Sequence, residues 1–156
     1  MRPTRHLHKR LGGAAAAATL FAVALFAVAP AGTAGAVYPG VPEWYSQAEE
    51  HLAHTTKFMQ AAVDAIEAND INALRAACSA VHDEQAIGLQ AHLPTPDPAL
   101  TTALQKQIND FHTAMHMCMS LGPNSTPVDL DLADSYAHQA IEDLKTVNDI
   151  LVEDLS

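Results

Sequence analysis

The chain has few basic residues: eight lysines and arginines stand against 18 aspartates and glutamates in 156 residues. Half of the basic residues, Arg2, Arg5, Lys9 and Arg10, lie at the start of the chain. Beyond residue 36, four basic residues therefore face all 18 acidic ones, a formal charge of −14. A surface with this charge repels nucleic-acid phosphates and anionic lipid headgroups. The composition thus argues against nucleic-acid binding and against electrostatic docking to a membrane.

An apolar run long enough to cross a bilayer is also missing. The run over residues 14–29 has 16 residues, whereas a membrane-spanning helix needs about 20. It follows the basic residues, stops at Pro30 and precedes the small residues Ala34 and Ala36, which is the order found in secretory signal peptides. We therefore expect residues 1–36 to be a cleaved signal peptide. Residues 37–156 would then form one secreted helical domain without a stable membrane anchor; an uncleaved anchor is the alternative.

No stretch beyond residue 36 alternates apolar and polar residues as a half-buried strand would. Apolar residues instead recur every three or four positions in four stretches of similar length, about 42–68, 70–93, 98–122 and 127–155. Proline or glycine residues lie between the second and third stretches and between the third and fourth. Asp70, Asp97 and Thr126 are suitable N-caps for the helices that follow them. The pattern predicts an all-α fold, an up-down-up-down four-helix bundle.

Each predicted helix has one apolar face that should form the core. For the third helix this face comprises Leu100, Leu104, Ile108, Phe111, Met115 and Cys118. For the fourth it comprises Ala133, Tyr136, Ala140, Leu144, Val147, Leu151 and Leu155.

Cysteine is scarce, with Cys78 on the apolar face of the second predicted helix and Cys118 on that of the third. Two cysteines in an exported domain favour one disulfide. In a symmetric helical hairpin the two positions would be offset by about five residues, roughly 7 Å along the axis. The bond between helices 2 and 3 therefore requires the proline-rich connection to shift their register. A bond between two chains and a thiolate metal site are the alternatives.

Motifs of the common enzyme classes are missing as well. The chain has no G-x-S-x-G sequence, phosphate-binding loop, dinucleotide fingerprint, zinc-protease helix or paired Glu-x-x-His motif. Adjacent acidic pairs such as Asp83-Glu84 and Glu142-Asp143 diverge on a helix, so we expect them to form solvated faces. We therefore expect a protein that is not an enzyme and that binds another protein or a small ligand.

Histidine is plentiful by contrast, with nine in the chain. His112, Met115, His116 and Met119 are spaced i, i+3, i+4 and i+7, so they share one face of the third predicted helix. Imidazole and thioether donors together suit copper, especially Cu(I), and His82 of the second helix is a further candidate ligand. In the alternative interpretation the methionines fill the core and the histidines are ordinary surface residues.

Haem is a second candidate cofactor, because a helical bundle can hold a porphyrin between two axial ligands. Without a Cys-x-x-Cys-His motif any haem would be bound noncovalently. His92 and His82 lie nearest the apolar face of the second helix and are the candidate ligands. In its export signal, size, helix content and cysteine count the chain resembles the small exported haem-binding proteins of mycobacteria. The likeness lies in these general features and in no ligand motif.

Overall fold

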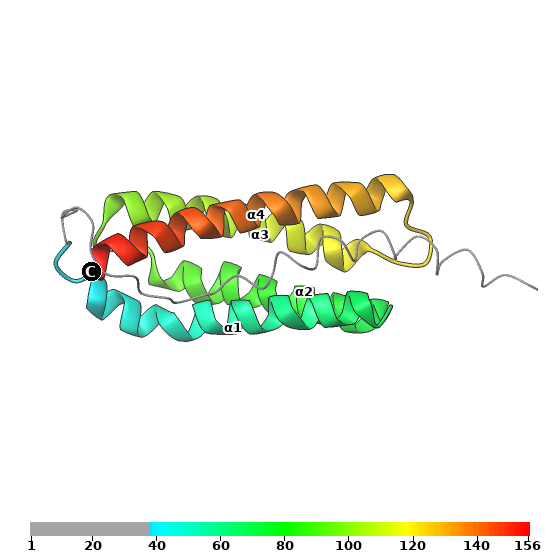
Figure 1. The fold of residues 1–156 in the computed structure, drawn as a ribbon, viewed down its shortest axis with the longest axis horizontal. Coiled ribbons are helices and arrows are strands. Elements are labelled where there is room, and N and C mark those ends of the chain that lie inside the picture. Colours follow the sequence, from blue (N-terminus) through cyan, green and yellow to red (C-terminus); the bar gives the residue numbers. More distant parts are fainter. Residues whose placement is uncertain (1–37) are drawn as a thin grey trace, which may run out of the picture.

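The computed structural model describes residues 38–156, which form four helices and, within this range, no strand. The elements are α1 (Val41–Glu67), α2 (Ile71–Asp83), a π-helical turn η3 (Glu84–Gly88), a 3₁₀ turn η4 (Leu89–His92), α3 (Pro98–Ser120) and α4 (Pro127–Asp154). Figure 1 shows successive helices running in opposite directions along one long axis. The predicted all-α fold with four helices is confirmed. The predicted signal peptide, residues 1–36, lies outside the described residues.

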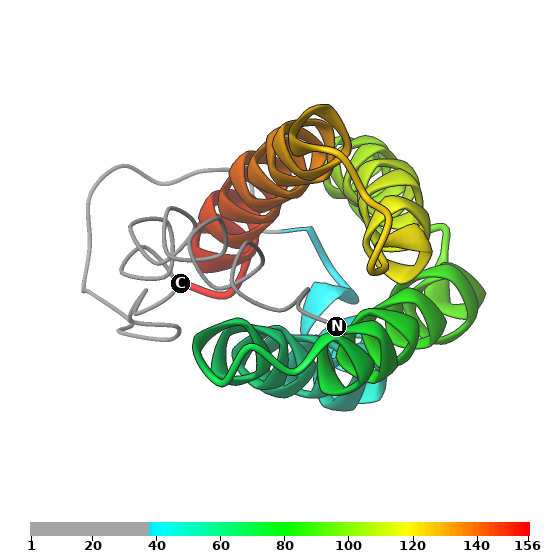
Figure 2. The same cartoon turned by 90° about the vertical axis from the view of Figure 1, so that its right-hand side faces the viewer.

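Viewed end-on, the helices form two layers, α1 with α2 and α3 with α4 (Figure 2). The two layers meet mainly where α2 packs on α3, while α1 packs on α2 and α4 packs on α3. Within residues 38–156 no helix combines the length and the hydropathy that crossing a membrane requires.

Side-chain caps determine where three of the helices begin. Asp70 and Asp97 each accept hydrogen bonds from two backbone N–H groups of the turn that follows. Thr126 and Asp129 form a reciprocal capping box at the start of α4. These bonds satisfy N–H groups that have no partner inside the first helical turn. The three N-caps expected from the sequence are therefore confirmed.

The second predicted helix is not uniformly α-helical. Its α-helical part ends at Asp83, and the π turn and the 3₁₀ turn continue it to His92. We call these three consecutive elements, α2, η3 and η4, the rod. A Cβ atom on Gly88 would lie only 2.8 Å from Cε1 of His51, so this part of the rod approaches α1 as closely as glycine permits. A single regular helix from residue 70 to 93 was therefore the wrong expectation for this segment. π turns are often found near functional sites.

The core consists of two apolar clusters separated by a polar layer. The disulfide-side cluster comprises Ala65, Leu74, Cys78, Val81, Phe111, Ala114, Met115, Cys118, Leu121, Ala133 and Ala140. The tryptophan-side cluster comprises Val41, Trp44, Ala48, Leu52, Leu89, Leu100, Leu104, Ile108, Val147 and Leu151. Between them Gln85 donates to Thr55 Oγ1 and Gln107 donates to Gln85 Oε1, both at 2.9 Å.

The predicted core faces are mostly buried. All six predicted core residues of α3 lie in one of the two clusters. In the fourth predicted helix, however, Tyr136 of α4 and Leu155, the residue that follows α4, are 38% and 42% exposed. The expectation that these two side chains belong to the core is therefore wrong.

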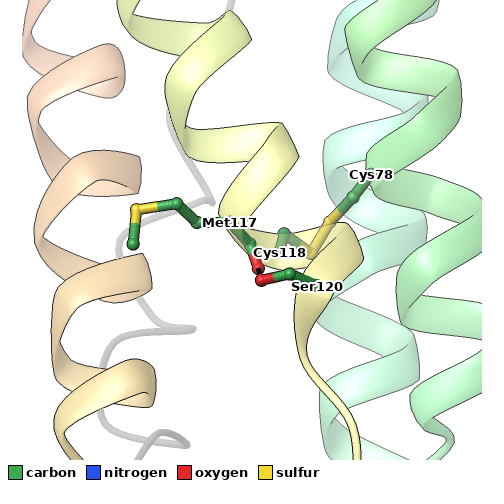
Figure 3. The surroundings of a disulfide bond; sticks show 4 residues. All are labelled: Cys78, Met117, Cys118 and Ser120. Atoms are coloured by element: carbon green, nitrogen blue, oxygen red, sulfur yellow. Dashed lines mark hydrogen bonds between the residues drawn. A yellow bond between two sulfur atoms is a disulfide. The ribbon is translucent and has the colours of Figure 1, made fainter. Parts of the chain in front are cut away.

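The predicted bond between Cys78 and Cys118 is present and links α2 to α3 (Figure 3). Gln90, three residues before Leu93, exchanges hydrogen bonds with Gln105, seven residues after Pro98. The two arms of the hairpin are thus shifted by about four residues relative to a symmetric pairing. This shift brings the Cα atoms of Cys78 and Cys118 to 6.2 Å from each other. Closing a 40-residue separation stabilises the fold by roughly 4 kcal/mol in the chain-entropy model. A disulfide is compatible with an oxidising compartment outside the cytoplasm.

Candidate metal site

Three histidines converge where α2 packs on α3. His82 lies in the last turn of α2, and His112 and His116 lie one turn apart on α3. One ring nitrogen of each residue lies within 4.8 Å of the other two. His82 is half-buried, whereas His112 and His116 are exposed. We call these three residues the trihistidine cluster.

Helix periodicity and the register of the disulfide explain this convergence. Cys78 and His82 are one turn apart and therefore lie on the same side of α2. On the antiparallel α3, the matching position is one turn before Cys118, and His112 and His116 flank that position. A chain that pairs Cys78 with Cys118 therefore brings His82 between the two histidines of α3.

One pair of nitrogen atoms is already spaced as two ligands of one ion. His82 Nε2 lies 3.1 Å from His112 Nδ1. Two imidazoles bound to a tetrahedral zinc ion at about 2.0–2.1 Å would have their nitrogens roughly 3.3 Å apart. Without a metal, a proton on one nitrogen must be donated to the other. A metal ion would take the place of that proton with little rearrangement.

A carboxylate orients one of the rings. His82 Nδ1 lies 3.1 Å from Asp83 Oδ1. This partner favours the tautomer with its proton on Nδ1, which leaves the lone pair of Nε2 facing His112. Metal-binding histidines in proteins generally have such an acceptor on the second ring nitrogen.

The electrostatics of the cluster favour the neutral form of His112. Partial desolvation lowers the pKa of His112, and the neighbouring His116 and His82 lower it further. Metals bind the neutral form of imidazole. A lowered pKa therefore keeps His112 competent to bind an ion in slightly acidic solution.

The two methionines of the predicted copper patch pack with the apolar core. Met115 is a buried member of the disulfide-side cluster, and Met119 packs against the same cluster. Of the predicted patch residues, His82, His112 and His116 are brought together by the structure. Three imidazoles suit Cu(II), Zn(II) or Ni(II), and a thioether contribution that would favour Cu(I) stays a prediction.

The two candidate haem ligands are separated. His82 belongs to the trihistidine cluster, whereas His92 lies in η4 with its ring 5.3 Å from that of His51. The backbone carbonyl of His92 accepts a 2.6 Å hydrogen bond from Trp44 Nε1. Ten residues along one rod correspond to roughly 15 Å, too far for both rings to bind one iron. Haem binding through either residue alone stays a prediction.

A second histidine group, which sequence reasoning missed, lies between α1 and η3. Nδ1 of His51 is 2.7 Å from one carboxylate oxygen of Glu84, and Nδ1 of His54 is 3.2 Å from the other. Glu84 is half-buried between the two rings. We call this group the carboxylate-centred cluster. The i, i+3 spacing of the histidines was visible in the sequence, but the position of Glu84 was not.

Acidic residues of two adjacent pairs are also less solvated than expected. Asp143 is buried, and Lys106 of α3 donates to both of its oxygens at 2.6 Å. Burial and the nearby Asp110 raise the pKa of Asp143, and Lys106 opposes this shift. The expectation of solvated faces is therefore wrong for Glu84 and Asp143. Both carboxylates connect neighbouring helices.

Comparison with known proteins identifies no relative: no protein-family model, no curated protein and no solved structure matches the chain significantly. The geometry and chemistry of the site are therefore the basis for a functional proposal.

Proposed function

We propose that the protein binds one divalent transition-metal ion, Cu(II) or Zn(II), through His82, His112 and His116. The observation that supports this most directly is the approach of one ring nitrogen from each of the three residues to within 4.8 Å. The tautomer favoured by Asp83 and the lowered pKa of His112 both favour free lone pairs at the site.

The donor set narrows the choice of ion. Three neutral imidazoles, without a carboxylate or thiolate among them, suit Cu(II), Zn(II) and Ni(II) far better than Ca(II) or Mg(II). The order of intrinsic affinities predicts that Cu(II) binds more tightly than Zn(II). Three protein ligands leave a further coordination position for water or an exchangeable ligand. Because His112 and His116 are exposed, that position is accessible from solvent.

The proposed place of action is outside the cytoplasm. The signal-like residues 1–36 and the disulfide support export. The strongly acidic surface attracts cations, which favours their approach to the site. We infer reversible metal binding by a secreted protein, with no catalytic step. Binding to another protein, the other role expected from the sequence, stays a prediction because no comparable set of residues supports it.

Calorimetric titration of the untagged, oxidised secreted protein with Cu(II) and with Zn(II) tests the proposal. One ion should bind per chain at pH 7.5. His112→Ala combined with His116→Ala should weaken binding by at least about 100-fold, because two of three ligands are lost. His54→Ala combined with His138→Ala is the matched control and should change affinity by less than about twofold. Equal losses in both double variants, or no stoichiometric site at all, would contradict the proposal.

The contribution of the methionines is tested separately. Met115→Leu combined with Met119→Leu preserves volume in the core and removes both thioethers. Affinity for Cu(II) should be unchanged within about twofold, because neither side chain belongs to the proposed donor set. A large loss of affinity would restore the mixed histidine–methionine site expected from the sequence.

A further inference from the structure

The disulfide and the trihistidine cluster are neighbours on the contact between α2 and α3. We propose that the Cys78–Cys118 disulfide controls the metal affinity of the cluster, so that the oxidised protein binds the ion tightly and the reduced protein releases it. This inference rests on the proposed metal site. It adds a redox control that metal binding alone does not require.

The ligands come from both helices, so the site depends on how α2 and α3 are placed relative to each other. His82 is the sole ligand on α2. Cys78 is one turn from it, about 6 Å along the axis, and on α3 Cys118 lies two residues, about 3 Å, beyond His116. The covalent bond thus fixes the register and separation of the helices within about one turn of His82 and His116.

The position of the bond in the hairpin increases its influence. The loop joining η4 to α3 lies at one end of the hairpin (Figure 1), whereas Cys118 is two residues before the opposite end of α3. The side-chain hydrogen bonds between the two arms of the hairpin at Gln85–Gln107 and Gln90–Gln105 lie on the loop side of His82. The site therefore lies in the part of the hairpin that the disulfide holds closed.

The fully buried side chains around the disulfide include more small residues than those in the rest of the core. Four of the eleven buried residues of the disulfide-side cluster are alanines, against one of ten in the tryptophan-side cluster, and the larger apolar side chains that complete the disulfide-side cluster are mostly only partly buried. Since apolar stabilisation scales with buried area, small side chains contribute less to holding the helices together. Figure 3 shows that the side chain of Met117, next to Cys118, extends towards α4 and away from the disulfide. Loss of the bond would therefore loosen α2 against α3 beside the ligands.

The chemistry of release is a thiol–disulfide exchange. A dithiol reductant attacks the Cys78–Cys118 bond, its two thiols supply two electrons and two protons, and it leaves as its own disulfide. The products in the protein are two cysteine thiols. By linkage, the factor by which the disulfide tightens metal binding equals the factor by which bound metal favours the disulfide.

Zn(II) affinity of the oxidised wild type and of Cys78→Ala with Cys118→Ala tests the inference. Zinc is redox-inert, and alanine leaves no thiol to act as a substitute ligand. The variant should bind zinc at least about tenfold more weakly while keeping its helical circular dichroism. Leu151→Ala, in the tryptophan-side cluster, is a control for general destabilisation and should retain wild-type affinity. Equal affinity of the wild type and the double cysteine variant would overturn the inference.

A second measurement applies if the double cysteine variant does not fold. The rate at which a phosphine reduces the bond in the wild type is measured with and without saturating Zn(II). Bound zinc should slow reduction severalfold, because the ion holds the same two helices together. An unchanged rate would contradict the inference. Absence of both stoichiometric Zn(II) and stoichiometric Cu(II) on the oxidised wild type would instead contradict the proposed function itself.

Discussion

The two histidine clusters lie on opposite sides of the same helical rod and differ in what occupies their centre. His82 and Glu84 are two positions apart, so one side chain points to α3 and the other to α1. In the carboxylate-centred cluster, Glu84 accepts a hydrogen bond from each imidazole and joins η3 to α1. In the trihistidine cluster ring nitrogens face one another, and the three potential ligands include no carboxylate. Under the proposed function, the central group therefore determines whether clustered histidines form a cross-link or a metal-binding site.

The largest expected difference between the clusters is in metal affinity. His82→Ala removes the sole ligand on α2 and should weaken Cu(II) and Zn(II) binding by at least about 100-fold. His51→Ala removes an imidazole whose Nδ1 is already hydrogen-bonded to Glu84 and should change affinity by less than about twofold. Calorimetric titration of both variants checks the comparison. A similar loss in both would show that the clusters do not differ in function.

The next largest difference is in packing. Gly88→Ala should destabilise the protein by about 1–3 kcal/mol, because the new methyl group would overlap the ring of His51 and displace it from Glu84. Gly122→Ala meets no heavy atom within 4 Å and should change stability by less than about 0.5 kcal/mol. Urea denaturation measures both. Wild-type stability of Gly88→Ala would show that the contact between η3 and α1 is not tight.

A smaller effect is expected when the central carboxylate becomes an amide. Glu84→Gln leaves one oxygen to accept from one histidine and turns an N–H group towards the other. The free energy of unfolding should fall by about 1 kcal/mol at pH 8. Glu50→Gln is the control, because that side chain is 78% exposed and lies 3.9 Å from His54. Metal binding should be unaffected in both variants. Equal stability of the two variants would indicate that Glu84 is not a cross-link.

The smallest effect is a dependence of stability on pH in the metal-free protein. Because the pKa of His112 is lowered in the folded state, the unfolded chain takes up this proton first as the pH falls. Stability should therefore decrease as the pH drops below about 6.5 and should not depend on this residue above about 7.5. His112→Gln should remove part of the decrease in urea denaturation at pH 7.5, 6.5 and 5.5. Parallel curves for wild type and variant would contradict this assignment.

Local patterns determined much of the fold. Apolar spacing, the caps at Asp70, Asp97 and Thr126 and the proline-rich breaks place the helices, because these interactions act within about one turn. The spacing of His112 and His116 likewise predicted that they would be neighbours. The pairing of Cys78 with Cys118 followed from their number and their place on apolar faces.

Other features depended on contacts between helices. The burial of Met115 with the core, and of Asp143 against Lys106, depends on the rotation of each helix about its axis. Counting 100° per residue along the sequence does not determine that rotation closely enough to decide whether a side chain at the edge of the apolar face is buried. The π turn that brings Glu84 to His51 and His54 has no local sequence pattern of its own.

The sequence by itself determined that two neighbouring histidines lie on α3, that a third lies on α2, and that both helices contain a cysteine. Only the tertiary structure decided that the third histidine meets the other two. The reason is that the helical backbone fixes side-chain spacing along one helix. The register between two helices depends jointly on the loop that connects them, the packing of the core and the disulfide.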